Sequence, residues 1–141
     1  MPRPAPAVVV DTNIVFSALL GGEGRFGEIL LRGESRFTVC ESVLVELFRH
    51  KERIVRLSRL TDDDVVRFYH IVLRHLTLYK EDLISPDQWR AARALCAAVD
   101  ETDTPHVALA LELDAPLWTG DKRLRSGLTA AGFTRFFLPD A

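Results

Sequence analysis

The stretch VVVDTN, residues 8–13, is central to the fold because three β-branched residues lead directly into a carboxylate. A run of this kind is typical of a short buried strand. A carboxylate at the end of such a strand costs free energy unless it is hydrogen-bonded or paired with a cation. Asp11 therefore indicates either a cap for the following helix or a site that requires a fixed carboxylate.

The rest of the chain alternates between strand-like and helix-like segments. Strands are predicted at residues 7–11, 36–40, 115–119 and 134–139. Helix starts are predicted from the polar residues Asn13, Ser42, Thr61, Ser85 and Thr104. This alternation predicts an α/β domain with a mainly parallel central sheet of four or five strands and helices on both faces. Residues 41–99 are too long for one crossover helix, so we expect about three helices there.

The composition is that of one globular domain. The chain has 141 residues, of which 48% are hydrophobic and 27% charged. We therefore predict a single domain over residues 1–141, with the proline-broken residues 1–6 as a flexible N-terminal arm. Cys40 and Cys96 have no metal-binding spacing, so we interpret both as reduced core residues. With no secretory signal or membrane-spanning run, a cytoplasmic location without membrane contact is expected.

The net charge of −2 does not favour binding of nucleic acid as a bulk polyanion, but the basic residues are unevenly distributed. One cluster lies within residues 49–59 and a second within 122–125. Either could be an ordinary solvated helix face. If the protein binds RNA, the candidate contacts are Arg49, Lys51, Arg53, Lys122 and Arg123.

Four acids lie near predicted strand ends or helix starts in four separate segments: Asp11, Glu46, Asp103 and Asp121. Ligands of open parallel sheets bind beyond the carboxyl ends of the strands. Two carboxylates about 4 Å apart repel by roughly 4 kcal/mol at an effective dielectric near 20, so convergence requires shared protons or a cation. Oxygen ligands without a Cys or His set favour Mg²⁺ or Mn²⁺. Each acid also has an ordinary structural interpretation. Asp11 could be a helix cap or turn residue, Glu46 a surface residue, Asp121 part of a Gly-Asp turn, and Asp103 a residue that favours the dipole of the following helix.

Taken together, the segments VVVDTNIVFSAL, CESVLVELFRH, DETDTPHVALALEL and PLWTGDKRL resemble the PIN-domain family of metal-dependent ribonucleases. The likeness extends to the VapC-like toxins of bacterial toxin-antitoxin pairs. It implies a single PIN-like domain that cleaves single-stranded RNA by attack of a metal-activated water. It also implies one or two Mg²⁺ or Mn²⁺ ions, an antitoxin partner and a homodimer.

The resemblance assigns roles to particular residues. Metal binding and catalysis are implied for Asp11, Glu46, Asp103 and Asp121, and supporting polar positions for Thr12, Asn13 and Thr119. Asp100 lies close enough in sequence to replace Asp103 as the third ligand. His106 departs from the family pattern, in which this position is more often apolar or aromatic, and is interpreted as a helix-face histidine rather than a ligand.

Two alternatives remain open from the sequence. A PIN-like module without catalytic activity would bind RNA or protein through the same surface. A phosphatase of the haloacid-dehalogenase type would also place an aspartate after its first parallel strand. That chemistry needs a second acid two residues later, and Asn13 occupies this position.

Overall fold

The computed structural model describes residues 5–21, 25–58 and 60–139, which form an α/β fold around a four-stranded parallel sheet. The strands are β1 (Ala7–Val10), β2 (Arg36–Cys40), β3 (Leu76–Tyr79) and β4 (Leu117–Trp118), in the order β3-β2-β1-β4. All three pairings are parallel. The predicted fold class, a parallel sheet with helices on both faces, is confirmed.

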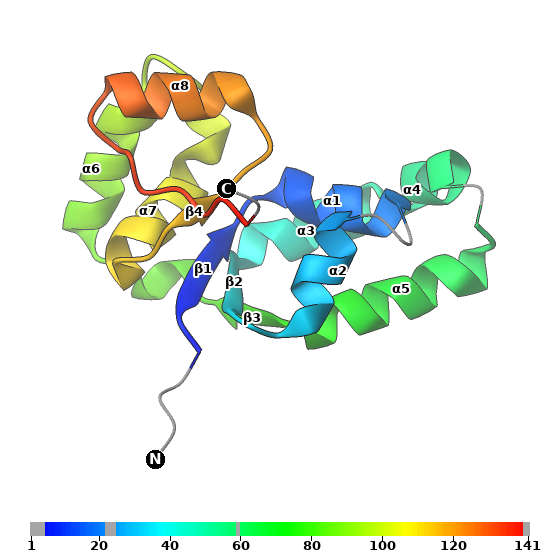
Figure 1. Ribbon diagram of the computed structural model, residues 1–141. Coiled ribbons are helices and arrows are strands. Elements are labelled where there is room, and N and C mark those ends of the chain that lie inside the picture. The colour runs from blue at the N-terminus through cyan, green and yellow to red at the C-terminus, as the bar shows by residue number, and fades with distance from the viewer. Residues whose placement is uncertain (1–4, 22–24, 59, 140–141) are drawn as a thin grey trace.

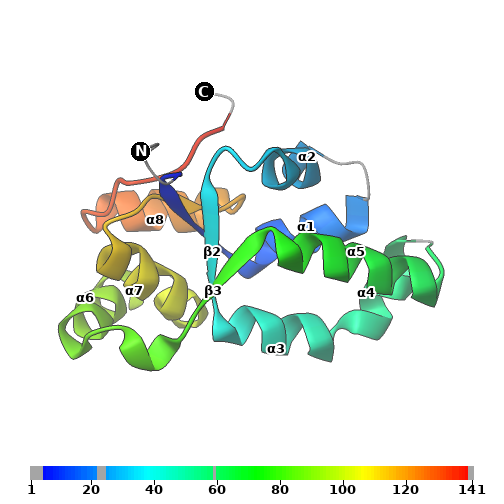
Figure 2. The same ribbon diagram turned by 90° about the horizontal axis from the view of Figure 1, so that it is seen from below.

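The helices lie in two groups on either side of the sheet (Figures 1 and 2). One group comprises α1 (Thr12–Gly21), α2 (Arg25–Arg32), α3 (Glu41–Arg49), α4 (Lys51–Ser58) and α5 (Asp62–Arg74). The other comprises α6 (Pro86–Cys96), α7 (Thr104–Leu113) and α8 (Lys122–Ala130). Two short 3-10 turns, η1 (Glu81–Leu83) and η2 (Glu101–Asp103), precede α6 and α7.

The alternating side chains of the strands divide the core into two parts. Val8 and Val10 belong to the apolar cluster on the α1–α5 side, whereas Val9 belongs to the cluster beneath α6–α8. Successive strand residues point to opposite faces, and both faces of this sheet are covered. This explains why the first strand is a continuous apolar run rather than an alternating one.

The predicted strand at 134–139 is wrong. Within that segment Phe136 forms one isolated parallel bridge with Leu117, and Phe137 donates its N–H to the Leu117 carbonyl at 2.9 Å. The pairing does not continue towards Pro139, which has no N–H to donate. The rings of Phe137 and Trp118 lie in edge contact instead, with centroids 5.3 Å apart.

The strand β3 was not predicted. It lies inside residues 41–99, where about three helices were expected and where the described residues form four, α3, α4, α5 and α6. It is four residues long, directly follows α5 and is only half-buried. Its register along β2, from Phe37↔Leu76 to Cys40↔Tyr79, satisfies backbone groups that would otherwise leave β2 at an open edge.

The predicted helix starts are partly confirmed. The side chains of Thr61 and Ser85 accept hydrogen bonds from the N–H groups of Asp64 and Gln88, as expected of N-caps. The predicted caps Asn13 and Ser42 are wrong, because α1 begins at Thr12 and α3 at Glu41. Helix α7 begins at Thr104 as predicted, although the Thr104 hydroxyl donates to the Glu101 carbonyl instead of capping the helix.

Both cysteines are buried and free, as predicted. Within the described part of the chain, no helix has the length and apolar character needed to cross a membrane. The predicted flexible arm includes residues 1–4, which lie outside the described residues.

Candidate functional site

Acidic side chains from several elements line one cavity of about 280 Å³ at the carboxyl ends of the parallel strands. The acids come from the end of β1, the middle of α3, the turn η2 with its N-cap, and the N-cap of α8. The lining residues are Asp11, Thr12, Asn13, Glu46, Asp100, Thr102, Asp103, His106 and Asp121. The structure thus brings together all four acids selected from the sequence, along with Thr12 and Asn13.

Asp11 is a buried acid of this cavity and is oriented by a hydrogen bond to the backbone. It is 2% exposed, and its Oδ1 accepts the N–H of Ile14 at 3.0 Å, which caps the first turn of α1. Its Oδ2 is buried and has no hydrogen-bond partner among the described residues. Burial raises the pKa of Asp11, the Thr119 side chain and the Ile14 N–H oppose that rise, and the Asp121 carboxylate adds to it. The fold therefore uses Oδ1 through Ile14, and the Thr119 side chain also stabilises the carboxylate. Oδ2 is the atom with hydrogen-bonding capacity left for a ligand.

Asp121 is also positioned by capping a helix. Its Oδ1 accepts the N–H groups of Arg123 and Leu124 at 2.9 and 3.1 Å. Its own N–H donates to the Thr119 hydroxyl oxygen at 3.1 Å, so the buried Thr119 fixes the turn that carries this acid. Asp121 therefore caps α8, a role that was not predicted from the sequence, and this role is compatible with a place beside the cavity.

Asp103 carries the strongest sign of carboxylate crowding. Burial is the main reason that its pKa rises to about 7, and Asp100, Asp11, Asp121 and Glu46 each raise it further. Asp100 is exposed, and the Thr102 side chain and N–H hold its pKa below the usual value. These contacts favour Asp103 over Asp100 as the acid that faces the other carboxylates.

Glu46 lies halfway along α3 and is partly exposed. In the part of the chain that the structure describes, no three His, Cys, Asp or Glu side chains are arranged to hold a metal ion as they stand. The acids therefore share a cavity without closing around one point. Mutual repulsion between unscreened carboxylates opposes such closure.

His106 was interpreted from the sequence as a helix-face residue, and the structure places it in the cavity wall instead. It is 4% exposed, its Nε2 lies 3.4 Å from the Thr12 hydroxyl, and its Nδ1 has no partner among the described residues. Burial lowers the pKa of His106 to about 4. The imidazole is thus neutral at neutral pH.

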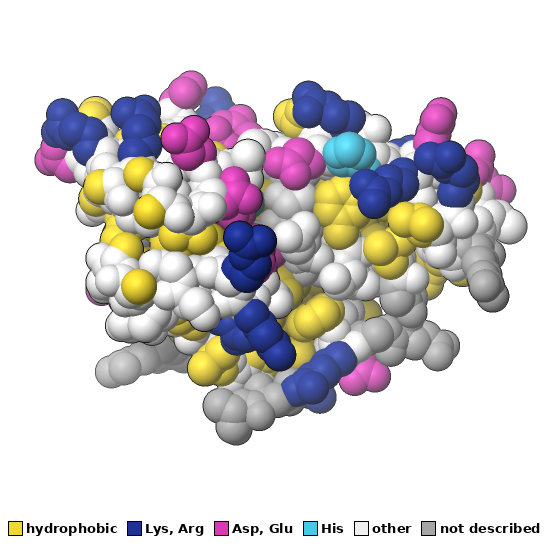
Figure 3. Space-filling view, turned by 90° about the horizontal axis from the view of Figure 1, so that it is seen from above, with side chains coloured by type: hydrophobic (Ala, Val, Ile, Leu, Met, Phe, Trp, Pro, Cys, Tyr) yellow, Lys and Arg dark blue, Asp and Glu magenta, His cyan; other side chains and the backbone are white. Residues whose placement is uncertain are grey.

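Several of the candidate RNA contacts lie in cavities next to the acids. Arg53 lines a cavity of about 450 Å³ together with Glu46, and Arg123 lines a smaller one with Asp100 and Asp121. Lys122 lines a third cavity beside Trp118. Arg49 is exposed and Lys51 partly buried. The face seen from above shows Lys and Arg side chains on several sides of the central Asp and Glu side chains (Figure 3).

Sequence reasoning missed two parts of the site. Thr102 lines the acid cavity and donates both its N–H and its hydroxyl to Asp100 Oδ1. The Asp-x-Thr spacing that is typical of such a turn is visible in the sequence at Asp100 and Thr102. Phe16, Ser17 and His50 line the neighbouring cavity, and their signal is helical spacing relative to Asn13 and Glu46.

Comparisons with known proteins agree with this architecture. In the VapBC2 complex from Rickettsia felis, solved bound to a DNA fragment from their promoter, one chain superposes with a TM-score of 0.67 and 15% sequence identity. The match covers 85% of the present chain and 92% of that chain, and at this identity it supports the fold alone. Comparison with curated proteins finds no match. A family model described as PIN domain matches residues 9–136, which include β1, the acid cavity and α8, so the chain belongs to the PIN-domain family.

Proposed function

We propose that this protein is a metal-dependent endoribonuclease that cleaves single-stranded RNA by attack of water. The observation that carries the proposal is the cavity lined by Asp11, Glu46, Asp100, Asp103 and Asp121, in which Asp11 Oδ2 has no hydrogen-bond partner among the described residues. Membership of the PIN-domain family supports it, since PIN domains are generally metal-dependent nucleases.

The residues present fit a hard divalent cation. Carboxylate oxygens dominate the lining, and Mg²⁺ and Mn²⁺ prefer oxygen ligands. Asp11 Oδ2 is buried without a hydrogen-bond partner in the described part of the chain, and the pKa of Asp103 is raised by burial and further by four neighbouring acids. Both observations indicate a site that would be stabilised by positive charge. One or two bound ions would relieve the repulsion that keeps the acids apart.

A bound divalent cation would activate water and stabilise the negative charge that develops on a phosphate under in-line attack. Asp11, Glu46, Asp103 and Asp121 would hold the ion. The Thr119 hydroxyl and the N–H groups of α8 keep Asp121 in place. The contact between His106 and Thr12 holds the start of α7 against α1. The chain would thus fix its acids before substrate binds, so little reorganisation is needed during reaction.

The basic residues around the acids would bind the RNA backbone. Arg53, Lys122 and Arg123 are the best placed, since each lines a cavity next to the acid cavity or beside α8. We further propose that the protein acts in the cytoplasm as the toxin of a toxin-antitoxin pair, held by an antitoxin and forming a homodimer. The structural likeness to a chain of a VapBC complex supports this assignment.

The direct test is cleavage of end-labelled single-stranded RNA by purified protein with Mn²⁺, with Mg²⁺ and with chelator. We expect metal-dependent cleavage that is lost in Asp11→Asn. Binding should weaken as salt rises, because each neutralised phosphate lowers the slope of log K against log salt by about 0.7 for single strands.

A matched control is Asp114→Asn, prepared in the same way. Asp114 is exposed, and its φ of 49° lies in the left-handed region that Asn tolerates. This variant should cleave like the wild type. Absence of cleavage by folded wild-type protein across varied RNAs and both metals would reject the nuclease and favour a module that only binds.

A further inference from the structure

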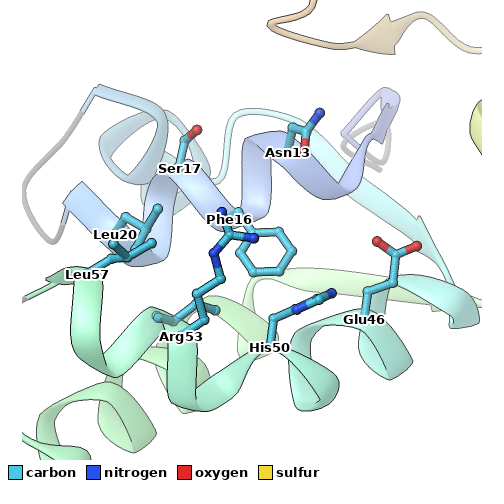
Figure 4. Close-up of a pocket in the computed structure, with 9 residues that line it drawn as sticks. Asn13, Phe16, Ser17, Leu20, Glu46, His50, Arg53 and Leu57 are labelled. Atoms are coloured by element: carbon cyan, nitrogen blue, oxygen red, sulfur yellow. The ribbon is translucent and has the colours of Figure 1, made fainter.

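A groove of about 450 Å³ lies between α1 and the consecutive helices α3 and α4 (Figure 4). Its two walls are helical stripes that face each other. Helix α1 contributes Asn13, Phe16, Ser17 and Leu20, and the opposite wall contributes Glu46, His50, Arg53, Ile54 and Leu57. Residues three or four apart share a helix face, so both stripes follow from the helical repeat.

The groove adjoins the acid cavity directly. Asn13 and Glu46 line both spaces, so a ligand held at the acids can extend directly into the groove. In Figure 4 the Glu46 carboxylate and the Arg53 guanidinium both point from their helices towards α1. The cationic side chain of Arg53, on α4, therefore lies on the same wall of the groove as the proposed metal ligand Glu46, on α3.

The lining combines aromatic, apolar and hydrogen-bonding groups. The rings of Phe16 and His50 meet edge to face, with centroids 5.8 Å apart and planes at 61°. Ile54 is a buried residue of the same lining, while Ser17 and Asn13 offer a hydroxyl and an amide. A nucleobase needs such a mixture, because its faces stack on rings and its edges need donors and acceptors.

We infer that this groove binds the nucleobase next to the cleaved phosphate of a single-stranded RNA. The inference rests on the proposed function and adds a specificity site to it. The volume lies within the range of about 300–1,000 Å³ that is typical of small-ligand pockets. Arg53 would neutralise the adjoining phosphate or stack on the base, and Ser17 and Asn13 would contact the base edge.

The test has two parts. A cleavage map of one RNA first locates the cut phosphate. Binding of the same RNA is then measured by fluorescence anisotropy in chelator, with each base replaced in turn by an abasic site. We expect one position beside the cut where base removal weakens binding about five- to a hundredfold, as stacking of one base implies.

Variants assign that position to the groove. Arg53→Ala and the space-filling Ser17→Phe should each abolish the penalty at that one position. Arg56→Ala removes the same charge from the same helix, at a residue outside the groove lining. Even if this variant binds RNA more weakly overall, removal of the base at that position should still weaken its binding. Circular dichroism establishes that each variant is folded.

The outcomes separate the two proposals. In one outcome the protein cleaves RNA, and removal of one base weakens binding equally in wild type and in both groove variants. This result would overturn the assignment of the base to the groove but would leave the proposed nuclease activity supported. In another outcome the protein cleaves no RNA, but removal of one base weakens binding in wild type and not in the groove variants. This result would support base binding in the groove and reject the nuclease. RNA that binds with no position-dependent penalty would overturn the inference and leave the groove to a protein segment.

Discussion

The Nε2 of His106 lies 3.4 Å from the hydroxyl of Thr12, and this contact joins the first turn of α7 to the first turn of α1. Thr12 directly follows Asp11, and His106 lies three residues after Asp103. A neutral imidazole packed between two helices therefore helps to set the separation of two proposed metal ligands. This role needs no direct contact between His106 and a metal.

In the His106→Leu variant, the free energy of unfolding should depend less on pH between about pH 4 and 6.5 than it does in wild type. The pKa of His106 is about 4 in the folded state and 6.5 in the unfolded state. The buried neutral imidazole therefore contributes its full share of the free energy of unfolding above pH 6.5, and this contribution is lost as pH falls towards 4. Wild type should lose about 2 kcal/mol relative to His106→Leu between pH 7 and 4.5, measured by urea unfolding. The exposed His70→Leu is the control, and parallel wild-type and His106→Leu profiles would contradict the prediction.

Asp11→Asn should separate metal binding from folding. The amide oxygen can still accept the N–H of Ile14, and a neutral group removes the cost of burying a carboxylate. The metal-free variant should be at least as stable as wild type by thermal unfolding, whereas the rise in Tm on adding Mn²⁺ should disappear. A retained Mn²⁺ shift would show that the ion binds elsewhere.

Metal affinity should depend on the ionisation of Asp103. Its pKa of about 7 lies above the usual value of 3.8, so the metal-free fold loses stability as pH rises through 7, opposite in sign to the effect of His106. A cation must displace the proton, so Mn²⁺ affinity should rise about tenfold from pH 6 to 8. Calorimetry in two buffers would detect the released proton. A pH-independent affinity in wild type, or the same pH dependence in Asp103→Asn, would contradict this.

Asp121 has a structural and a chemical role that substitutions can separate. Asp121→Ala removes the oxygen that accepts the N–H groups of Arg123 and Leu124. The variant should lose about 1 kcal/mol of stability and should also lose cleavage activity. Asp121→Ser retains an N-capping oxygen and should keep most of the stability while cleavage is still lost. Equal loss of stability in both variants would argue against the capping role.

Gly127 should not tolerate a methyl group. A Cβ there would lie 2.5 Å from Cγ2 and 2.9 Å from Cγ1 of Val99, so Gly127→Ala should destabilise by about 1–3 kcal/mol despite its better helix propensity. Adding Val99→Ala to Gly127→Ala should restore part of the lost stability, because it removes the two methyl groups that the new Cβ would meet. Gly27→Ala in α2 is the matched control, because its nearest neighbour is 3.9 Å away, and it should gain about 0.5–1 kcal/mol in denaturant unfolding.

Local sequence patterns determined much of this structure. The apolar run before Asp11, the caps Thr61 and Ser85, and the alternation of strands and helices each depend on residues close in the chain. Four acids at strand ends and helix starts could be selected for the same reason, since parallel strands present their carboxyl ends at one edge. These features need only backbone propensities and a helical or strand repeat.

Other features depend on contacts between distant residues. Strand β3 forms because β2 offers it an unpaired edge, and the N–H of Ser42 in α3 is satisfied by Glu81, 39 residues away. The burial of His106 and the crowding that raises the pKa of Asp103 arise only when α1, α3, α7 and α8 meet. The sequence alone determined which carboxylates could form a site, and only the tertiary structure decided which oxygens face the cavity, because hydrogen bonding and burial act across the assembled sheet.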